Sequence, residues 1–462
     1  MAKDHHSPNQ DKFHEETHRV RSTKRTDMGN AVRLIADFGD DIRYCPEWRQ
    51  WLLWDGSRFN PDIAGQIVRL AARSADLYRK NRYEAQSEEE EGRIGGWGTS
   101  SENFSRLTST VKLAATDPQI IVHPDELDTD PFLLNVKNGV IDLKSGKLIR
   151  PERKYLQTKM ANVVFDSKAK APLFRKFLNR ITDGDISLCN SVIDLLGYCM
   201  TGDVGEQKIF LIHGPGQNGK SVLLELIRNM LGDYGQVMDF ETLLQTDKSG
   251  ARADIARMVG ARFISASEAN PGVKWDEAAV KQLTGGDRLN ARHLFKDPFE
   301  FDPTHKIICA VNHLPEITGN DYSIWRRTIV IPFEVTIPNS ERDNNLLEKM
   351  REEKSGILNL LIQGCLNWQM NGLVMPESIV RASDKYRAGM DSVFGFVEGR
   401  CKPDPDAVTP VSELRAAYES WCESGDFAKV GVRLFASRLE ALGYDSVRMP
   451  GGSRARKGLR VV

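Results

Sequence analysis

Between residues 208 and 335, short apolar runs alternate with segments whose apolar residues recur at helical spacing. The apolar runs cover 208–213, 262–268, 306–311 and 328–333. Runs of this length separated by helical segments are typical of buried strands in a parallel sheet, because the connecting helices cover both faces of that sheet. The pattern therefore predicts an α/β domain.

The pattern changes outside this stretch. Residues 1–25 are polar with almost no aliphatic side chains, which predicts a disordered tail. Helical spacing at 63–81 and a strand–turn–strand pattern at 134–148 predict a mixed α+β region. We expect five segments: a tail at 1–25, the α+β region at 26–170, the α/β core at 171–340 with a helical lead-in at 171–205, a helical segment and linker at 341–394, and a last domain at 395–462.

Composition narrows the class of protein only a little. The chain has 462 residues, enough for about three domains. Its 63 Lys and Arg against 64 Asp and Glu give a net charge of −1, which excludes a uniformly basic nucleic-acid coat but permits a local basic surface. Seven scattered cysteines without a CxxC pair predict free thiols in a reducing compartment. No apolar run reaches the roughly 20 residues of a membrane span, and the start lacks the apolar core of a signal peptide, so we expect a cytoplasmic protein without membrane contact.

A glycine-rich loop follows the first apolar run. The pattern G-x-x-x-x-G-K-S occupies 214–221, with a strand pattern before it and a helical pattern at 222–231 after it. Glycines let backbone N–H groups close around phosphate oxygens, and the helix N-terminus favours an anion. Lys220 would bind the β- and γ-phosphates, and Ser221 would offer a hydroxyl to Mg²⁺. The predicted ATP-binding positions are Gly214, Pro215, Gly216, Gln217, Asn218, Gly219, Lys220 and Ser221.

Polar residues follow the later apolar runs. Glu268 ends the second run, at the carboxyl edge of the predicted sheet where chemistry is concentrated in such folds, and is a candidate to hold Mg²⁺ and orient water. Asn312 ends the third run and would contact the γ-phosphate or the attacking water. Arg326 and Arg327 precede the fourth, and arginine suits stabilisation of charge on a transferring phosphoryl group. On its own, such an arginine pair is more often a salt-bridging pair at a strand start.

A basic hairpin is predicted between the second and third runs. The alternation around 296–297 favours two strands, with a tip that carries Arg288, Arg292, His293 and Lys296. Basic groups on a projecting hairpin suit contact with a nucleic-acid backbone. A polar, solvent-exposed hairpin without a ligand is the alternative.

These residues, in this order, resemble superfamily 3 helicases. The similarity is to the phage and plasmid branch, which is similar to the poxvirus D5 protein and to the carboxyl-terminal part of phage and plasmid primase-helicases. The segments 26–31, 51–56 and 138–143 resemble the D5-type amino-terminal region, and Tyr386, Tyr418 and Trp421 resemble the linker and a winged-helix tail. The resemblance covers most of the chain after residue 25.

The resemblance implies a fold and an activity. The fold is an AAA+-like, P-loop superfamily 3 core between a D5-like region and a winged helix that binds DNA. The activity is that of a homo-hexameric ring that hydrolyses ATP with Mg²⁺ and translocates on single-stranded and forked DNA, working with a primase or polymerase in a phage, prophage or plasmid replication system of a bacterial host. Glu268 would activate water, Asn312 would sense the γ-phosphate, Arg326 or Arg327 would act in trans, and the hairpin would line the pore.

Two departures from the pattern affect these roles. Ser267 stands where many members carry a second acid, so Glu268 would serve both metal and water. The stretch before Asp27 is too short for a primase domain, so we expect no primer synthesis by this chain.

Two other classes remain open: a non-translocating DNA-binding or assembly module in which ATP only stabilises the ring, and a P-loop small-molecule kinase. The basic hairpin argues against the kinase.

Overall fold

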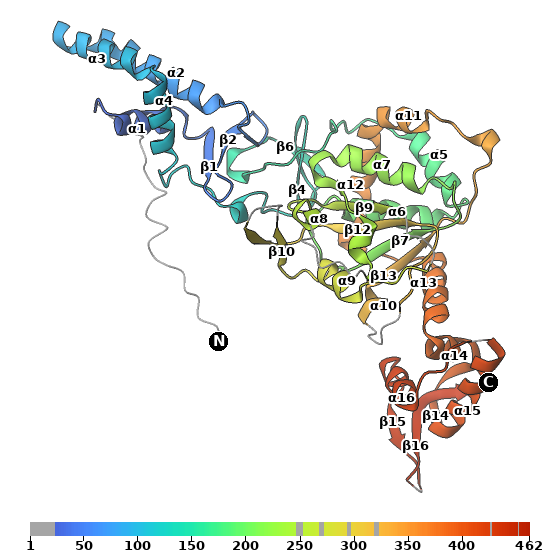
Figure 1. Cartoon of the computed structure of the whole chain (residues 1–462). Helices are drawn as coiled ribbons and strands as arrows, with labels where there is room; N and C mark the ends of the chain where they lie inside the picture. Colours follow the sequence, from blue (N-terminus) through green and yellow to red (C-terminus); the bar gives the residue numbers. More distant parts are fainter. Residues whose placement is uncertain are drawn as a thin grey trace. The chain divides into compact units, whose positions relative to one another are not determined.

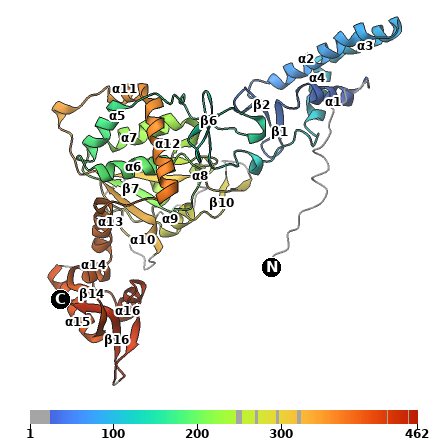
Figure 2. The same ribbon diagram turned by 180° about the vertical axis from the view of Figure 1, so that it is seen from behind.

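The computed structural model of the chain separates into two compact units (Figures 1 and 2). One unit comprises the chain up to residue 129 together with 150–159, and the other comprises 130–149 and 160–462. The described residues are 24–245, 253–267, 272–292, 297–317, 323–425, 427–450 and 452–462. Most of the predicted tail, and the predicted site residues Glu268, His293 and Lys296, lie outside them.

In its described residues, the first unit combines four α-helices with a small antiparallel sheet of order β1-β2-β3. Its core is formed by Leu34, Ile42, Trp51 and Ile67, which are all buried, and Trp54 packs its ring against Phe59 at 5.2 Å. Its elements are α1 (Asp27–Phe38), β1 (Ile42–Cys45), β2 (Gln50–Trp54), β3 (Phe59–Pro61), α2 (Gln66–Lys80), α3 (Glu88–Ser101) and α4 (Phe104–Ala114).

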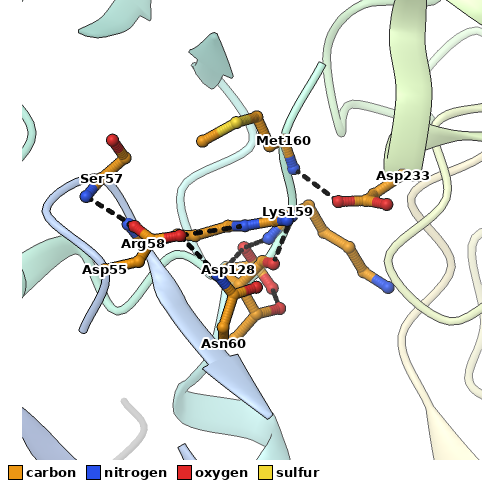
Figure 3. Close-up of polar contacts among 9 residues, drawn as sticks. Asp55, Ser57, Arg58, Asn60, Asp128, Lys159, Met160 and Asp233 are labelled. Carbon is orange, nitrogen blue, oxygen red and sulfur yellow. Dashed lines mark hydrogen bonds and ion pairs between the residues drawn. The ribbon is translucent and has the colours of Figure 1, made fainter. Parts of the chain in front are cut away.

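Two carboxylates fix the loops of this unit. Figure 3 shows Asp55, at the β2–β3 turn, accepting hydrogen bonds from the backbone N–H groups of Ser57 and Arg58 at 2.8 and 2.9 Å. Asp128 accepts from the backbone N–H groups of Thr158 and Lys159 at 2.8 and 3.4 Å. These last bonds join segments 30 residues apart and explain why 150–159 returns to this unit.

The second unit is built on a five-stranded parallel sheet of order β13-β7-β12-β9-β8. The prediction of an α/β fold with a parallel sheet is therefore confirmed. The strands are β7 (Ile209–His213), β8 (Gly235–Val237), β9 (Phe263–Ser267), β12 (Lys306–Val311) and β13 (Thr328–Pro332). Because all five are parallel, their carboxyl ends share one edge of the sheet and their amino ends share the other.

Both faces of the sheet are buried, which explains the continuous apolar runs. In β7, Phe210 and Ile212 belong to one core cluster, whereas Ile209 and Leu211 belong to the other. The first face packs against α5 (Pro172–Ile181), α6 (Ile186–Tyr198), α7 (Lys220–Leu231) and α12 (Lys354–Asn371), and the second contacts α8 (Ala253–Ala256), α9 (Glu277–Thr284), α10 (Ser323–Arg327) and α13 (Glu377–Met390).

Smaller elements surround this sheet. Glu353, between α11 and α12, accepts hydrogen bonds from the backbone N–H groups of Leu173 and Phe174 at 3.0 and 2.9 Å and so caps the start of α5. The additional elements are an antiparallel sheet of β4 (Leu133–Val136), β5 (Gly139–Asp142) and β6 (Lys147–Ile149), the hairpin of β10 (Leu289–Arg292) and β11 (Pro298–Phe301), and α11 (Leu346–Glu352).

Two buried cations tie loops to the amino-terminal edge of the sheet. Arg262, just before β9, donates to the backbone oxygens of Met200 and Leu133 at 2.7 and 2.8 Å. Lys306, the first residue of β12, donates to the backbone oxygens of Thr201, Asp203 and Thr304. Burial lowers the pKa of Lys306 to about 7. These side chains satisfy carbonyl groups that would otherwise be buried without donors.

The carboxyl-terminal segment has its own core. Phe396, Leu414, Tyr418, Phe435 and Leu459 are all buried there. A three-stranded antiparallel sheet has the order β14-β16-β15. The elements follow one another as α14 (Ser392–Arg400), β14 (Cys401–Pro410), α15 (Val411–Gly425), α16 (Val432–Ala441), β15 (Ser446–Arg448) and β16 (Arg454–Val461). Among the described helices of the whole chain, none combines the length and apolarity that a membrane crossing requires.

Candidate nucleotide-binding site

The glycine-rich loop connects β7 to α7 at the carboxyl edge of the sheet. Gly219 has a φ of +84°, a conformation that favours glycine, and it precedes the first helical residue, Lys220. A Cβ on Gly214 would lie 1.8 Å from the backbone oxygen of Phe333, so only glycine fits there. Backbone conformation at Gly219 and close backbone packing at Gly214 thus explain why the loop carries glycine at these two positions.

Lys220 lies beneath this loop. Its side chain is 5% exposed, and Nζ donates to the backbone oxygen of Gly214 at 2.7 Å and to Oδ1 of Asn312 at 3.0 Å. Asn312 directly follows β12, the neighbour of β7 in the sheet. The structure therefore brings together two predicted site residues that are 92 positions apart in the chain.

The electrostatics of the loop favour an anion. Burial, reinforced by the Lys220 charge, lowers the pKa of His213, so its imidazole is neutral at pH 7 and Lys220 supplies the positive charge beside it. The first N–H groups of α7, a 12-residue helix, add the partial positive charge of a helix start. Together with the exposed Ser221, this donor set fits a nucleotide phosphate, and the Ser221 hydroxyl is a suitable ligand for Mg²⁺.

The structure describes β9 only as far as Ser267. In the sheet, Ser267 pairs with Ala310, two residues before Asn312, so β9 ends at the same edge as the loop. Glu268 itself lies outside the described residues, and its role stays a prediction. Within the described part of the chain, no group of three His, Cys, Asp or Glu side chains is arranged to hold a metal ion.

The two predicted arginines lie at the opposite edge of the sheet. They end α10, just before β13, and Thr328 of β13 pairs with Ile209 at the start of β7. Arg327 is half-buried, and its Nη1 donates to the backbone oxygen and Oγ1 of Thr284 at 3.1 and 3.2 Å. Arg326 is exposed. The strands rise about 3.3 Å per residue, so the five residues of β7 separate these arginines from the loop of the same chain.

The predicted hairpin is present as β10 and β11, with a correction to its tip. Arg292 pairs with Pro298 at the tip end, whereas Leu289 pairs with Phe301 at the base. Arg288 precedes Leu289, so it lies at the base and not at the tip, and it forms an ion pair with Asp302 at 3.4 Å. The alternation of apolar and polar residues predicted where the two strands lie. The position of each basic residue along the hairpin depends on which residues pair across the strands, and alternation does not give that pairing. His293 and Lys296 fall outside the described residues.

Three contacts on the loop have no counterpart in the sequence motif. The backbone N–H of Ile337 donates to the backbone oxygen of Gln217 at 2.9 Å, and the Arg342 guanidinium donates to the Gln217 side chain. Asn218 Nδ2 donates to the backbone oxygen of Phe333 at 2.7 Å. The segment 333–342 thus braces the loop from more than 100 residues away, and no spacing rule relates the two segments.

Comparisons with known proteins match three parts of the chain. The family described as "D5 N terminal like" matches residues 31–183, and "Poxvirus D5 protein-like" matches residues 388–449. Between them, residues 212–327 match a family of unknown function, DUF5906. The two D5-type matches lie before and after residues 212–327 in the sequence, and they confirm the resemblance to the D5-like branch of helicases.

Curated relatives come from large DNA viruses. The chain is 28% identical to a "Putative helicase" of Acanthamoeba polyphaga mimivirus over 61% of its own length, and 28% identical to one of Frog virus 3 over 45%. It is 23% identical to a "Putative primase" of African swine fever virus over 73%. The matches span only 32%, 23% and 38% of those proteins. The printed names of these three relatives are thus two helicases and one primase.

A solved structure, the apo C-terminal region of NrS-1, covers 93% of this chain and 99% of its own. The TM-score is 0.47 and the identity 10%, a similarity that establishes neither fold nor function.

Proposed function

We propose that the chain is an ATP-dependent DNA helicase that acts as a homo-hexameric ring and translocates on single-stranded DNA. The observation that carries this proposal is Lys220, whose ammonium group is held between the loop oxygen of Gly214 and the Asn312 amide at the carboxyl edge of a parallel sheet. That position suits a cation that binds the β- and γ-phosphates of ATP.

The residues of the loop have separate tasks in this proposal. Lys220 and the loop N–H groups bind and orient the phosphates, and Ser221 with Glu268 would hold Mg²⁺. When bound, Mg²⁺ neutralises charge on the β- and γ-phosphate oxygens. Asn312 already contacts Lys220, so it can report through its amide whether a γ-phosphate is present. Glu268 would orient and deprotonate the attacking water.

A neighbouring subunit completes the site in this proposal. Arg326 is exposed at the amino edge of the sheet, whereas the loop of the same chain lies at the carboxyl edge. It can therefore serve ATP only when a second copy presents that edge. Arg327 donates hydrogen bonds to Thr284 of its own chain, which favours Arg326 as the residue that acts in trans.

The DNA contacts are proposed at two places. The β10–β11 hairpin would line the pore, with Arg292 near its tip end and Arg288 at its base. His293 and Lys296 are the other two residues predicted to contact DNA. The order of α14, β14, α15, α16, β15 and β16 supports a winged helix, in which two strands follow the third helix as a wing.

The biological setting is a further part of the proposal. The resemblance favours replication of a phage, prophage or plasmid in the cytoplasm of a bacterial host, with a primase or polymerase as partner. The viral relatives support a replication role and extend the range of sources to DNA viruses.

ATP hydrolysis with and without DNA tests the proposal. We expect the full chain to hydrolyse ATP, single-stranded DNA to stimulate hydrolysis, and the Lys220→Ala variant to lose it by about 100-fold or more, because a cation on the transferring phosphates is missing. A matched control is Lys208→Ala, which removes a lysine that precedes β7 and pairs with Glu206 at 2.7 Å. Hydrolysis retained in Lys220→Ala would exclude the site, and indifference to DNA would favour the small-molecule kinase.

Strand displacement on forked DNA of both polarities then separates a helicase from a non-translocating module. A helicase displaces one strand in an ATP-dependent reaction that Lys220→Ala abolishes. DNA-stimulated hydrolysis without displacement on either fork would favour the module in which ATP only stabilises the ring.

A further inference from the structure

The segment 333–342, called the strap below, runs from the end of β13 to the glycine-rich loop. β13 pairs with β7 in register as far as Pro332 and His213. The backbone N–H of Phe333 extends this pairing, because it donates to the backbone oxygen of His213 at 2.7 Å. The strap therefore starts at the carboxyl edge of the sheet, beside the strand that leads into the loop.

The far end of the strap is tied to the helix that follows the glycine-rich loop. Helix α11 begins shortly after the strap and packs on α7 (Figures 1 and 2). Arg351 of α11 forms an ion pair with Glu225 of α7 at 3.1 Å. Both ends of the strap are thus held by elements that flank the loop, which gives the strap a defined position relative to it.

Between these two ends, the strap contacts one residue of the loop twice. The backbone N–H of Ile337 donates to the backbone oxygen of Gln217 at 2.9 Å, and the Arg342 guanidinium donates to Oε1 of Gln217. Nη2 of Arg342 also donates to the backbone oxygen of Ile337 at 3.2 Å. The Arg342 side chain therefore links both partners of this contact.

Gln217 has a backbone conformation that residues with a side chain disfavour. Its φ is +69°, in the left-handed region that glycine adopts freely and that other residues enter at a cost in free energy. A residue other than glycine keeps such a conformation only where surrounding contacts hold it. The two hydrogen bonds from Ile337 and Arg342 are contacts of this kind.

The conformation of Gln217 affects the N–H groups that the loop offers to an anion. Gln217 and Gly219 both have a positive φ, whereas Asn218 between them does not. A change of handedness between successive residues turns their N–H groups toward one concavity, which binds an anion. The left-handed conformation of Gln217 therefore helps to set the direction of the N–H groups in the loop.

We propose that Arg342 is a positioning residue for ATP, which holds Gln217 in its left-handed conformation and so keeps the N–H groups of the loop directed at the phosphates. This inference rests on the proposed function, because the glycine-rich loop is the nucleotide site there. It adds to that site a residue that lies far outside the motif. Arg342 acts through Gln217 and requires no contact with the nucleotide itself.

The affinity of the full chain for a slowly hydrolysed ATP analogue with Mg²⁺, measured by calorimetry, tests this role without requiring hydrolysis. In Arg342→Ala we expect the Kd to rise about fivefold, because a hydrogen bond that offsets the cost of the left-handed conformation is lost. Gln217→Ala should match it, since it removes the acceptor of the same bond. Lys349→Ala is the control and should leave the Kd unchanged, because it removes an exposed cation whose partner is Asp343, at 2.6 Å.

A glycine at position 217 separates positioning from direct contact and from a general loss of stability. Glycine adopts a positive φ without strain, so in the Gln217→Gly background the Arg342→Ala substitution should no longer change the Kd. A residue that contacted the nucleotide directly, or that only stabilised the fold, would have the same effect in both backgrounds. Unchanged affinity in Arg342→Ala, or an equal loss in both backgrounds, would overturn the positioning role.

The proposed function is judged by separate measurements. Arg342 and Gln217 are both exposed, so these substitutions leave the core intact. A parent chain that binds the analogue, but neither hydrolyses ATP nor displaces a DNA strand, would refute the helicase and leave the role of Arg342 standing. A parent chain that binds no nucleotide would overturn both.

Discussion

At the scale of single residues, the two arginines before β13 illustrate how neighbours in sequence take different parts. Arg327 donates to the backbone oxygen and hydroxyl of Thr284 and so ties the end of α9 to the sheet. Arg326, one position earlier, is exposed. The sequence offers both as candidates to act in trans, and only the contacts of the folded chain separate a structural arginine from one directed outward.

Substitution of each arginine should therefore have a distinct outcome. Arg327→Ala should lower the free energy of unfolding by about 1–2 kcal/mol, because Thr284 loses its donor. Arg326→Ala should leave stability unchanged but reduce ATP hydrolysis by about 1,000-fold, the contribution expected of an arginine that acts in trans. Urea titration and steady-state ATPase assays measure the two effects.

Mixing two inactive variants provides the control. A ring assembled from Arg326→Ala and Lys220→Ala subunits contains some interfaces with both residues intact, so the mixture should be more active than either variant alone. Full activity of Arg326→Ala, or no recovery in the mixture, would contradict the assignment.

At the scale of elements, the start of β12 depends on a buried lysine. Lys306 donates to three backbone oxygens of the surrounding loops, and burial lowers its pKa to about 7 from the ordinary 10.5. Between these two values the unfolded chain binds the proton more strongly than the folded protein does. The contribution of Lys306 to stability must therefore rise with pH across that window and level off below about pH 7.

The Lys306→Met variant tests this linkage. It should be less stable than the parent by about 1–3 kcal/mol at pH 7, because three carbonyl groups lose a donor. The deficit should grow between pH 7 and 9 with a slope of at most about 1.4 kcal/mol per pH unit. Urea unfolding at several pH values measures it, with the exposed Lys147→Met variant as control. A deficit that shrinks with rising pH would contradict the lowered pKa.

At the scale of the whole molecule, two groups of predicted site residues lie at opposite edges of the sheet, and this separation bears on the proposed assembly. The phosphate loop lies at the carboxyl edge and Arg326 at the amino edge, so one subunit cannot bring both to one nucleotide. Head-to-tail contacts between copies can, and such heterologous contacts form a ring when the rotation that relates successive copies closes. This separation within the sheet supports the proposed head-to-tail ring, whereas six subunits are what the resemblance to ring helicases implies.

Mass measurement of the purified chain tests the ring. With a slowly hydrolysed ATP analogue and Mg²⁺, we expect a species about six times the subunit mass of 52.0 kDa, because the nucleotide is bound between subunits. Lys220→Ala should shift the distribution toward smaller species. A monomer under all conditions would contradict the ring and the trans role of Arg326.

The sequence by itself determined the parallel α/β sheet and the loop between β7 and α7. Both are local: buried strands require continuous apolar runs, and a loop that lets phosphates approach its backbone requires glycines at fixed positions. The D5-type resemblance depended on the same local motifs. The sequence also located the β10–β11 hairpin, but it assigned Arg288 to the wrong end because alternation does not fix register.

The tertiary structure alone decided which distant residues meet. In the folded chain, Lys220 donates a hydrogen bond to Asn312, and Arg342 donates one to Gln217. Arg327 donates to Thr284, and Arg448 pairs across the strands with Arg454. No periodicity relates such partners, because strand order and side-chain packing bring together positions that are far apart in the chain, 125 residues for Gln217 and Arg342. The sequence thus shows the chemical type of each residue, whereas the fold determines which residue it contacts and therefore which role it can have.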